Sequence, residues 1–242
     1  MAGNIKRIVL AGGGHAHLGV LHAWAKAPPP DTQRILVTSS RYTAYSGMLP
    51  GWMAGIYSQD QMLVDLAPLA AAAGVELLIA EVTGLDADAG RLLLSTGAQL
   101  EFDLLSLAIG GIIDTVPLAA TGARLLPVRP VEAFMAGWQA ALTGPRSGAE
   151  YDVAVVGGGA GGFELACAAQ AAFHHKYGAG RVALVAARGQ LLAGHARAVT
   201  GAGRTALIER GITLIEANAS GHAQGLALPG GEILSAGLVI AA

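Results

Sequence analysis

The chain has 242 residues, of which 53% are hydrophobic and only 13% charged, so its composition predicts a large buried core and excludes a disordered chain. The net charge of −2 and the lack of clustered lysines and arginines exclude an electrostatic nucleic-acid binder. The single cysteine, Cys167, excludes an intrachain disulfide. No run of about 18 uncharged apolar residues predicts a membrane span. The first residues lack a signal-peptide core, so we expect a cytoplasmic protein.

Two glycine clusters each follow a short aliphatic segment and precede an alanine-rich segment. The first aliphatic segment, residues 7–11, leads into GGGHAH at residues 12–17. The second, residues 153–156, leads into GGGAGG at residues 157–162. Uninterrupted apolar strands that alternate with helices are typical of parallel sheets covered on both faces. Both clusters are therefore predicted to join a buried strand to a helix.

The order of segments around each glycine cluster is the same, which indicates an internal repeat. The sequence therefore predicts an α/β chain with two Rossmann-like dinucleotide-binding domains, parallel sheets and small antiparallel β insertions. The corresponding later strands are residues 34–38 and 181–185, residues 74–82 and 211–217, and residues 102–110 and 235–242.

A linker-like stretch, TGPRSG at residues 143–148, separates the two copies. We expect an FAD-binding domain at residues 1–145 and an NAD(P)-binding domain at residues 146–242. In the sequence comparison, the second copy stops one residue before the equivalent of Gly110. We therefore expect a segment beyond residue 242 that completes both domains.

The glycine spacing has a physical reason in dinucleotide binding. The first glycine forms the tight turn, the second lets the backbone approach the pyrophosphate, and the third allows close packing of helix and strand. Backbone N–H groups at the helix start then face the anion. The alternative is a pair of glycine turns without a ligand. The second copy has Gly157, Gly159 and Gly162 at these positions, whereas the first has Gly12, Gly14 and, in the third place, His17.

The end of the second strand of such a domain commonly carries an acid that binds a ribose hydroxyl. The first copy instead has Ser39 and Ser40, whose hydroxyls can serve the ribose, followed by Arg41. The second copy has alanines followed by Arg188, which can pair with a 2′-phosphate and favours NADP over NAD. The alternative for Arg188 is a solvated loop residue.

No metal site is predicted. His15 and His17 are two positions apart at a helix start, so they point to different faces, and no acidic or cysteine partner is near them in the sequence.

The chain resembles the flavoprotein family with two dinucleotide-binding domains that includes glutathione reductase, type II NADH dehydrogenase and sulfide:quinone reductase. It is most similar to the flavoprotein module fused ahead of selenide, water dikinase. The residues that carry the resemblance are GGGHAH at 12–17, YSGMLPG at 45–51 and GGGAGGFELA at 157–166. The resemblance implies that the first glycine turn holds FAD and the second NAD(P)H.

The resemblance also implies roles for residues outside the glycine turns. The segment that includes Ser46, Gly47, Met48 and Pro50 would lie against the flavin. Glu164 would lie near the nicotinamide, its alternatives being a capping or a solvated acid. The residues expected to contact the cofactors are Gly12, Gly14, His15, Ala16, Ser39, Ser40, Arg41, Ser46, Gly47, Met48, Pro50, Val82, Ala108, Gly110, Gly157, Gly159, Ala160, Gly161, Gly162, Glu164 and Arg188.

The resemblance implies an FAD-dependent oxidoreductase that passes a hydride from NAD(P)H to the flavin and then electrons to an acceptor. A quinone fits the type II dehydrogenases, and a selenium compound or another small oxidant fits the dikinase-fused module. Cysteine pairs are lacking, which argues against thiol–disulfide and sulfide chemistry, and Cys167 is interpreted as a packing residue. The alternative is a nucleotide-binding or redox-sensing module without turnover. Peripheral contact with a membrane stays open for the expected segment beyond residue 242. The oligomeric state is not predicted.

Overall fold

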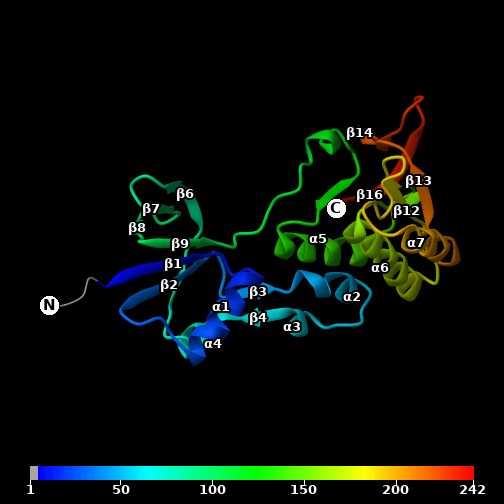
Figure 1. Cartoon of the computed structure of the whole chain (residues 1–242). Coiled ribbons are helices and arrows are strands. Elements are labelled where there is room, and N and C mark those ends of the chain that lie inside the picture. Colours follow the sequence, from blue (N-terminus) through cyan, green and yellow to red (C-terminus); the bar gives the residue numbers. More distant parts are fainter. Residues whose placement is uncertain (1–4) are drawn as a thin grey trace. The chain divides into compact units, whose positions relative to one another are not determined.

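The computed structural model describes residues 5–242, and its strands and helices alternate along the chain as the sequence predicts (Figure 1). Residues 1–4, part of the start that lacks a signal-peptide core, lie outside this described range. Parallel sheets flanked by helices and small antiparallel strands confirm the predicted α/β class with Rossmann-like units.

The first parallel sheet contains the strand before the first glycine turn at its centre. Its strands are short and aliphatic, and the central ones are buried on both faces, which is typical of a parallel sheet. In spatial order the strands are β5 (Glu76–Ile79), β2 (Thr32–Thr38), β1 (Lys6–Ala11) and β9 (Leu104–Leu107).

Side chains that alternate along β1 enter two different cores. Leu10 packs in a core with residues of the helices α1 (His15–Lys26) and α4 (Leu66–Ala72). Val9 points to the opposite face and packs in a second core. That core is closed by an antiparallel sheet of β6 (Val82–Asp86), β7 (Arg91–Leu94) and β8 (Gln99–Glu101).

Short elements lie between β2 and α4. Asp65 at the end of the second strand of an antiparallel ribbon caps α4, since its side chain accepts the Ala67 N–H. These elements are β3 (Tyr42–Ala44), η1 (Ser46–Met48), α2 (Leu49–Met53), α3 (Gln59–Met62) and β4 (Leu63–Asp65).

The second parallel sheet repeats the arrangement of the first around the second glycine turn. Its long strand β16 pairs with parallel neighbours through its carboxyl-terminal part and with β15 through its amino-terminal part. The strands are β13 (Thr213–Glu216), β12 (Val182–Ala186), β11 (Tyr151–Val156), β16 (Ile233–Ala241), β15 (Gly225–Ala227) and β14 (Ser220–His222), with β10 (Arg124–Pro127) beside β16.

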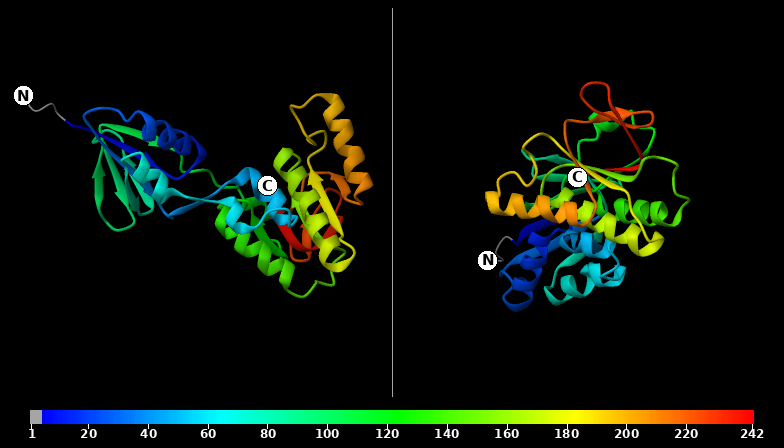
Figure 2. Two further views of the ribbon diagram at one scale, coloured as in Figure 1. Left: turned by 90° about the horizontal axis from the view of Figure 1, so that it is seen from below. Right: turned by 90° about the vertical axis from the view of Figure 1, so that its right-hand side faces the viewer.

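Helices and a β hairpin cover opposite faces of the second sheet. Ala154 and Val239 pack with residues of the β14–β15 hairpin region and with Leu118 of η2 (Val116–Leu118). Val153 and Val155 alternate with Ala154 and therefore point to the other face. Helices lie beside that sheet (Figure 2), namely α5 (Val131–Thr143), α6 (Ala160–Tyr177) and α7 (Arg197–Glu209).

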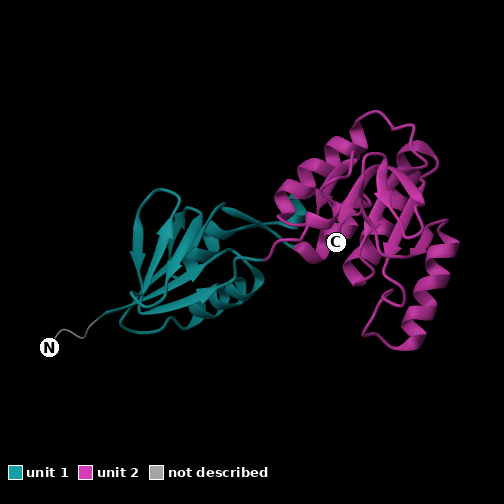
Figure 3. Ribbon diagram, turned by 90° about the horizontal axis from the view of Figure 1, so that it is seen from above, with its two compact units in different colours: residues 1–45, 60–110 teal, residues 46–59, 111–242 magenta. Residues whose placement is uncertain are grey.

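The described chain divides into two compact units (Figure 3). Unit 1 runs up to Tyr45 and includes Asp60–Gly110, and unit 2 comprises Ser46–Gln59 and Gly111–Ala242. This division differs from the predicted boundary at residue 145. Two contacts explain the difference: β10 pairs with β16 in the second sheet, and α2 packs on α6.

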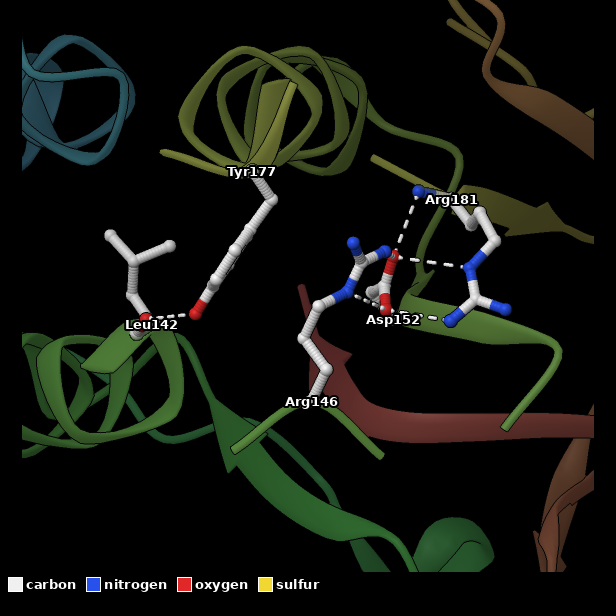
Figure 4. Close-up of polar contacts among 5 residues, drawn as sticks. All are labelled: Leu142, Arg146, Asp152, Tyr177 and Arg181. Carbon is white, nitrogen blue, oxygen red and sulfur yellow. Dashed lines mark hydrogen bonds and ion pairs between the residues drawn. The ribbon is translucent and has the colours of Figure 1, made fainter. Parts of the chain in front are cut away.

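A buried carboxylate joins three segments of unit 2 (Figure 4). Asp152 of β11 has a side chain only 1% exposed and pairs with Arg146 and Arg181. Arg181 donates its backbone N–H to Oδ2 at 3.0 Å and Nη2 to Oδ1 at 2.9 Å, and Arg146 donates Nε to Oδ1 at 3.0 Å. Burial raises the pKa of the Asp152 carboxyl, but the hydrogen bonds from Arg181 and Arg146 outweigh it and hold that pKa below its usual range.

We predict that D152N lowers the free energy of unfolding by about 2–4 kcal/mol at neutral pH, because it leaves two guanidinium groups without their counter-charge. The folded pKa of Asp152 is lowered, so its stabilisation is complete above the unfolded value of about 4 and is lost as the pH falls through the folded value. Urea unfolding at pH 7 and pH 3 measures both effects. An equal loss at the two pH values would contradict the ion-pair explanation, and D88N in an exposed turn is the control.

Candidate functional site

The first glycine turn is fixed by close contact with the end of β9. Gly12 has φ +95° and donates its N–H to the Val37 carbonyl at 2.7 Å. A Cβ on Gly12 would lie 2.3 Å from the Ala108 carbonyl oxygen, and one on Gly14 would lie 2.7 Å from the same atom. The structure therefore brings three predicted site residues together. Gly14 is the N-cap of α1 and no side chain caps this helix, which leaves the N–H groups of His15 and Ala16 available to an anion.

His17 fills the place of the third glycine with a buried hydrogen-bonding side chain. It is 1% exposed, with Nδ1 2.6 Å from the Gly12 carbonyl oxygen and Nε2 2.9 Å from Ser106 Oγ. The Gly12 carbonyl can only accept, so Nδ1 donates to it, while the Ser106 hydroxyl completes the contact at Nε2. His17 thereby ties the turn to β9, a link that sequence analysis missed because Ser106 is 89 residues away.

Tyr45 lies beside the start of α1. Its ring centroid is 4.5 Å from that of His15, and the Tyr45 side chain is 43% exposed. His15 therefore faces an exposed aromatic ring, while His17 faces the interior. The resemblance pointed to the segment that contains Tyr45, but the contact with His15 could not be inferred from the spacing.

The loop after β2 carries the predicted ribose contacts. Ser40 accepts the Tyr42 N–H at 3.1 Å through its hydroxyl, and Ser39 lies next to it. Arg41 forms a double hydrogen bond with Asp65, at 2.8 and 2.6 Å. The hydrogen bond from Arg41 lowers the pKa of the Asp65 carboxyl. The Arg41 guanidinium is thus committed within unit 1, and the two hydroxyls stay the predicted ribose contacts.

Two other predicted residues of unit 1 lie at strand ends. Val82 begins β6 and its side chain packs against the core on that face of the first sheet. Gly110 has φ +78° and follows Ala108, whose N–H is bonded to the Ala11 carbonyl at 2.8 Å. Contact of Val82 and Gly110 with a cofactor remains a prediction.

The segment that the resemblance places against a flavin belongs to unit 2. Ser46, Gly47 and Met48 form η1, and Pro50 lies in the first turn of α2, which packs on α6. Packing in unit 2 accounts for their local structure, and their contact with a flavin remains a prediction.

The second glycine turn combines three crowded glycines, Gly157, Gly158 and Gly162, with two open ones. Gly157 has φ +137°, and a Cβ there would lie 2.5 Å from the Ala242 carbonyl oxygen. A Cβ on Gly162 would lie 2.0 Å from the Gly157 carbonyl oxygen. By contrast, a Cβ on Gly159 or Gly161 would meet no atom within 4 Å. The crowded glycines fix the turn, and the open ones leave space at the start of α6.

The start of α6 has the same chemistry as the start of α1. Gly159 is its N-cap and no side chain caps it, so the N–H groups near Ala160 have no side-chain acceptor. The helix begins in open space, which fits the approach of a pyrophosphate. Glu164 is exposed in the second turn of α6, so it is not the cap of this helix.

The structure corrects the alignment of the two copies by one residue. Ala108 donates to the Ala11 carbonyl at 2.8 Å, and Ala242 donates to the Val156 carbonyl at 3.0 Å. Ala242 is therefore the equivalent of Ala108, so residue 242 precedes the equivalent of Gly110 by two positions. The sequence comparison had placed it one position later.

Arg188 lies in an exposed turn after β12, at the carboxyl edge of the second sheet. Within residues 5–242 it makes no hydrogen bond or ion pair with another side chain. Glu216 at the end of the neighbouring strand β13 lies close to this turn, and Arg204 pairs with Glu216 at 2.6 Å. The hydrogen bond from Arg204 lowers the pKa of Glu216, and smaller contributions come from the Gly189 N–H and the charge of Arg188. Glu216 could not be found from the sequence pattern, because this acid lies on the third strand of the repeat and not on the second.

The described residues contain no group of three or more histidine, cysteine, aspartate or glutamate side chains that could hold a metal ion. None of the helices in the described range has the length and apolar character needed to cross a bilayer.

A family model described as pyridine nucleotide-disulphide oxidoreductase matches residues 6–242. No curated protein matches the chain.

Many solved structures share the fold, and three of them illustrate the likeness. The structure of NDH2 from Plasmodium falciparum in complex with NADH has a TM-score of 0.81 at 15% identity, and the match covers 98% of this chain and 55% of that one. The covalent putidaredoxin reductase–putidaredoxin complex has a TM-score of 0.77 at 22% identity, with 98% and 58% covered. An engineered water-forming NADPH oxidase bound to NADPH has a TM-score of 0.75 at 17% identity, with 98% and 53% covered. The chain thus spans between half and three fifths of each matched chain.

We predict opposite effects for alanine at two neighbouring glycines of the second turn. G162A forces a Cβ against the Gly157 carbonyl and should destabilise the fold by about 1–3 kcal/mol, in the range of overpacking. G161A projects into open space within α6 and should be neutral or stabilise by up to about 1 kcal/mol. Urea unfolding of both variants tests this. Similar destabilisation by both variants would contradict the conclusion that the Gly157 carbonyl restricts position 162 to glycine.

Proposed function

The chain belongs to the pyridine nucleotide-disulphide oxidoreductase family, and from this premise we propose that it is an FAD-dependent NAD(P)H oxidoreductase of the type II NADH dehydrogenase kind. The observation that carries the proposal is the repeated strand–turn–helix site. Each copy presents an uncapped helix start directly after a strand, at a turn whose first glycine has a positive φ. Hydride exchange between two dinucleotide cofactors requires one such binding turn for each of them.

FAD and NAD(P)H are the cofactors of this family's oxidoreductases. We assign FAD to the turn of Gly12 and Gly14, with Ser39 and Ser40 toward its ribose. We assign NAD(P)H to the turn of Gly157, Gly159 and Gly162, because the open space beside Gly159 fits a pyrophosphate. When both are bound, the nicotinamide supplies a hydride that the flavin accepts.

The protein's own groups then bind and orient the cofactors. Backbone N–H groups at the starts of α1 and α6 bind the pyrophosphates through charge and helix dipole. His17 keeps the first turn in place through Gly12 and Ser106. Hydride transfer needs no acid or base from the chain, so these residues act by positioning and by excluding water. Glu164 is proposed near the nicotinamide.

We propose NADPH as the preferred donor because Arg188 follows two alanines at the end of β12. An acid at this position would repel a 2′-phosphate, whereas a free guanidinium pairs with it. The engineered NADPH oxidase with the same fold is described as a mutant in which an aspartate became alanine and the adjacent alanine became arginine. Ala187 followed by Arg188 has the same pattern.

The proposed acceptor is a quinone, on the resemblance to type II NADH dehydrogenases. The resemblance to the dikinase-fused module adds a selenium compound or another small oxidant as the alternative acceptor. Cys167 is the only cysteine of the sequence, so it has no redox partner in the chain. It lies on α6, where burial raises the pKa of its thiol.

The direct test of the function is the visible spectrum of the purified chain with FAD, under anaerobic conditions, before and after NADPH is added. We expect the flavin absorption to bleach and to return when a soluble quinone is added. A yellow protein that does not bleach would support the module without turnover. A colourless protein that takes up no added FAD would contradict the FAD assignment.

We predict that R188A weakens NADPH binding about 10–100-fold, since loss of a charge-assisted hydrogen bond costs about 1.5–3 kcal/mol. NADH lacks the 2′-phosphate, so its affinity should not change. Titration calorimetry of both nucleotides measures this, with R210A, at the exposed arginine that follows the last residue of α7, as control. Equal loss for both nucleotides would contradict a 2′-phosphate contact.

A further inference from the structure

Unit 2 contains a cavity of about 200 Å³ at the edge of its sheet opposite the glycine turn. Arg124, which begins β10, and Asp152, the second residue of β11, both line it. These are the amino ends of parallel strands, whereas Gly157 follows the carboxyl end of β11. The cavity is therefore separate from the predicted dinucleotide site of the same unit.

The cavity wall carries an arginine without a partner. The Arg124 side chain makes no hydrogen bond or ion pair within residues 5–242. Arg146 lines the same cavity and uses Nε and Nη2 for Asp152, while its guanidinium lies 5.1 Å from the centroid of the Tyr177 ring. Figure 4 shows Arg146 and Arg181 on either side of the Asp152 carboxylate. Positive charge is thus presented to the cavity from two segments.

Asp152 is the only carboxylate among the lining residues, and it cannot neutralise both Arg124 and Arg146. Its two oxygens already accept hydrogen bonds from Arg146 and Arg181, so Asp152 has no capacity left for Arg124 or for a cation. Glu150 lies near Arg181, outside the lining. The cavity therefore keeps an excess of positive charge in a chain whose net charge is −2.

The remaining wall suits a small polar molecule. A Cβ on Gly237 would lie 2.2 Å from Ser147 Oγ, so glycine at this position lets Ser147 pack onto β16. The Ser147 hydroxyl is a further donor on the lining, next to the apolar side chains of Phe173 and Leu238. The volume is below the roughly 300–1,000 Å³ of pockets that hold drug-sized ligands.

We propose that this cavity binds a small oxyanion, a phosphate or a carboxylate of a compact organic acid, held by Arg124 and Arg146. The Arg124 guanidinium supplies an unpaired fork of donors, and Arg146 supplies its free Nη1. The site goes beyond the proposed function and does not depend on it.

The test is titration of the purified chain with sodium phosphate and, separately, with sodium citrate, at ionic strength held constant with sodium chloride. Heteronuclear NMR shifts of the side-chain and backbone N–H groups around the cavity give the affinity. We expect saturable binding that R124Q weakens at least about 10-fold, the effect of one charge-assisted contact. R210Q, at an exposed site outside the cavity, should bind as the original chain does.

R124Q removes no hydrogen bond of the described structure, so it should keep the stability of the original chain, and urea unfolding checks this. Saturable binding of phosphate alone would identify a phosphate site, and tighter binding of citrate would identify a carboxylate site. Shifts no larger than those with chloride, or equal affinities for R124Q and the original chain, would overturn the proposal.

Discussion

Close packing of backbone against backbone at two strand-to-helix turns is the constraint on which the structure depends. At the second turn, the Gly157 carbonyl occupies the space where a Cβ of Gly162 would lie, so α6 can approach β11 only through glycine. The same turn donates the Gly157 N–H to Val185, which links β11 to β12. The position of the helix start, and with it the proposed anion site, follows from this packing.

The two copies reach the same arrangement with different third residues. Gly12 and Gly157 make equivalent hydrogen bonds to the next strand, at 2.7 and 2.9 Å. In the first copy, however, His17 replaces the third glycine and binds the Gly12 carbonyl oxygen with its side chain. A side-chain hydrogen bond thus takes the place of the third glycine in the first turn, whose other two glycines still pack against the Ala108 carbonyl. Both solutions leave an uncapped helix start, which is the feature that the proposed function uses.

The pattern of apolar segments and the spacing of the glycines predicted the strands, the repeat and the helix starts. These features depend on local geometry and on burial along the sequence. Contacts across long sequence separations could not be predicted in the same way. Three contacts join segments that only the folded chain brings together. They are the hydrogen bond of His17 with Ser106, the pairing of Arg41 with Asp65, and the approach of Glu216 to the turn of Arg188. The domain boundary differed for the same reason, since β10 joins the second sheet through pairing with β16.

The central claim is that each glycine turn binds its own dinucleotide through backbone N–H groups. The most direct measurement is the NMR spectrum of the ¹⁵N-labelled chain during separate additions of FAD and NADPH. We expect FAD to shift the amide signals of Gly14 to Ala16, and NADPH to shift those of Gly159 to Gly161. Shifts from FAD at the second turn, or shifts at neither turn with either nucleotide, would contradict it.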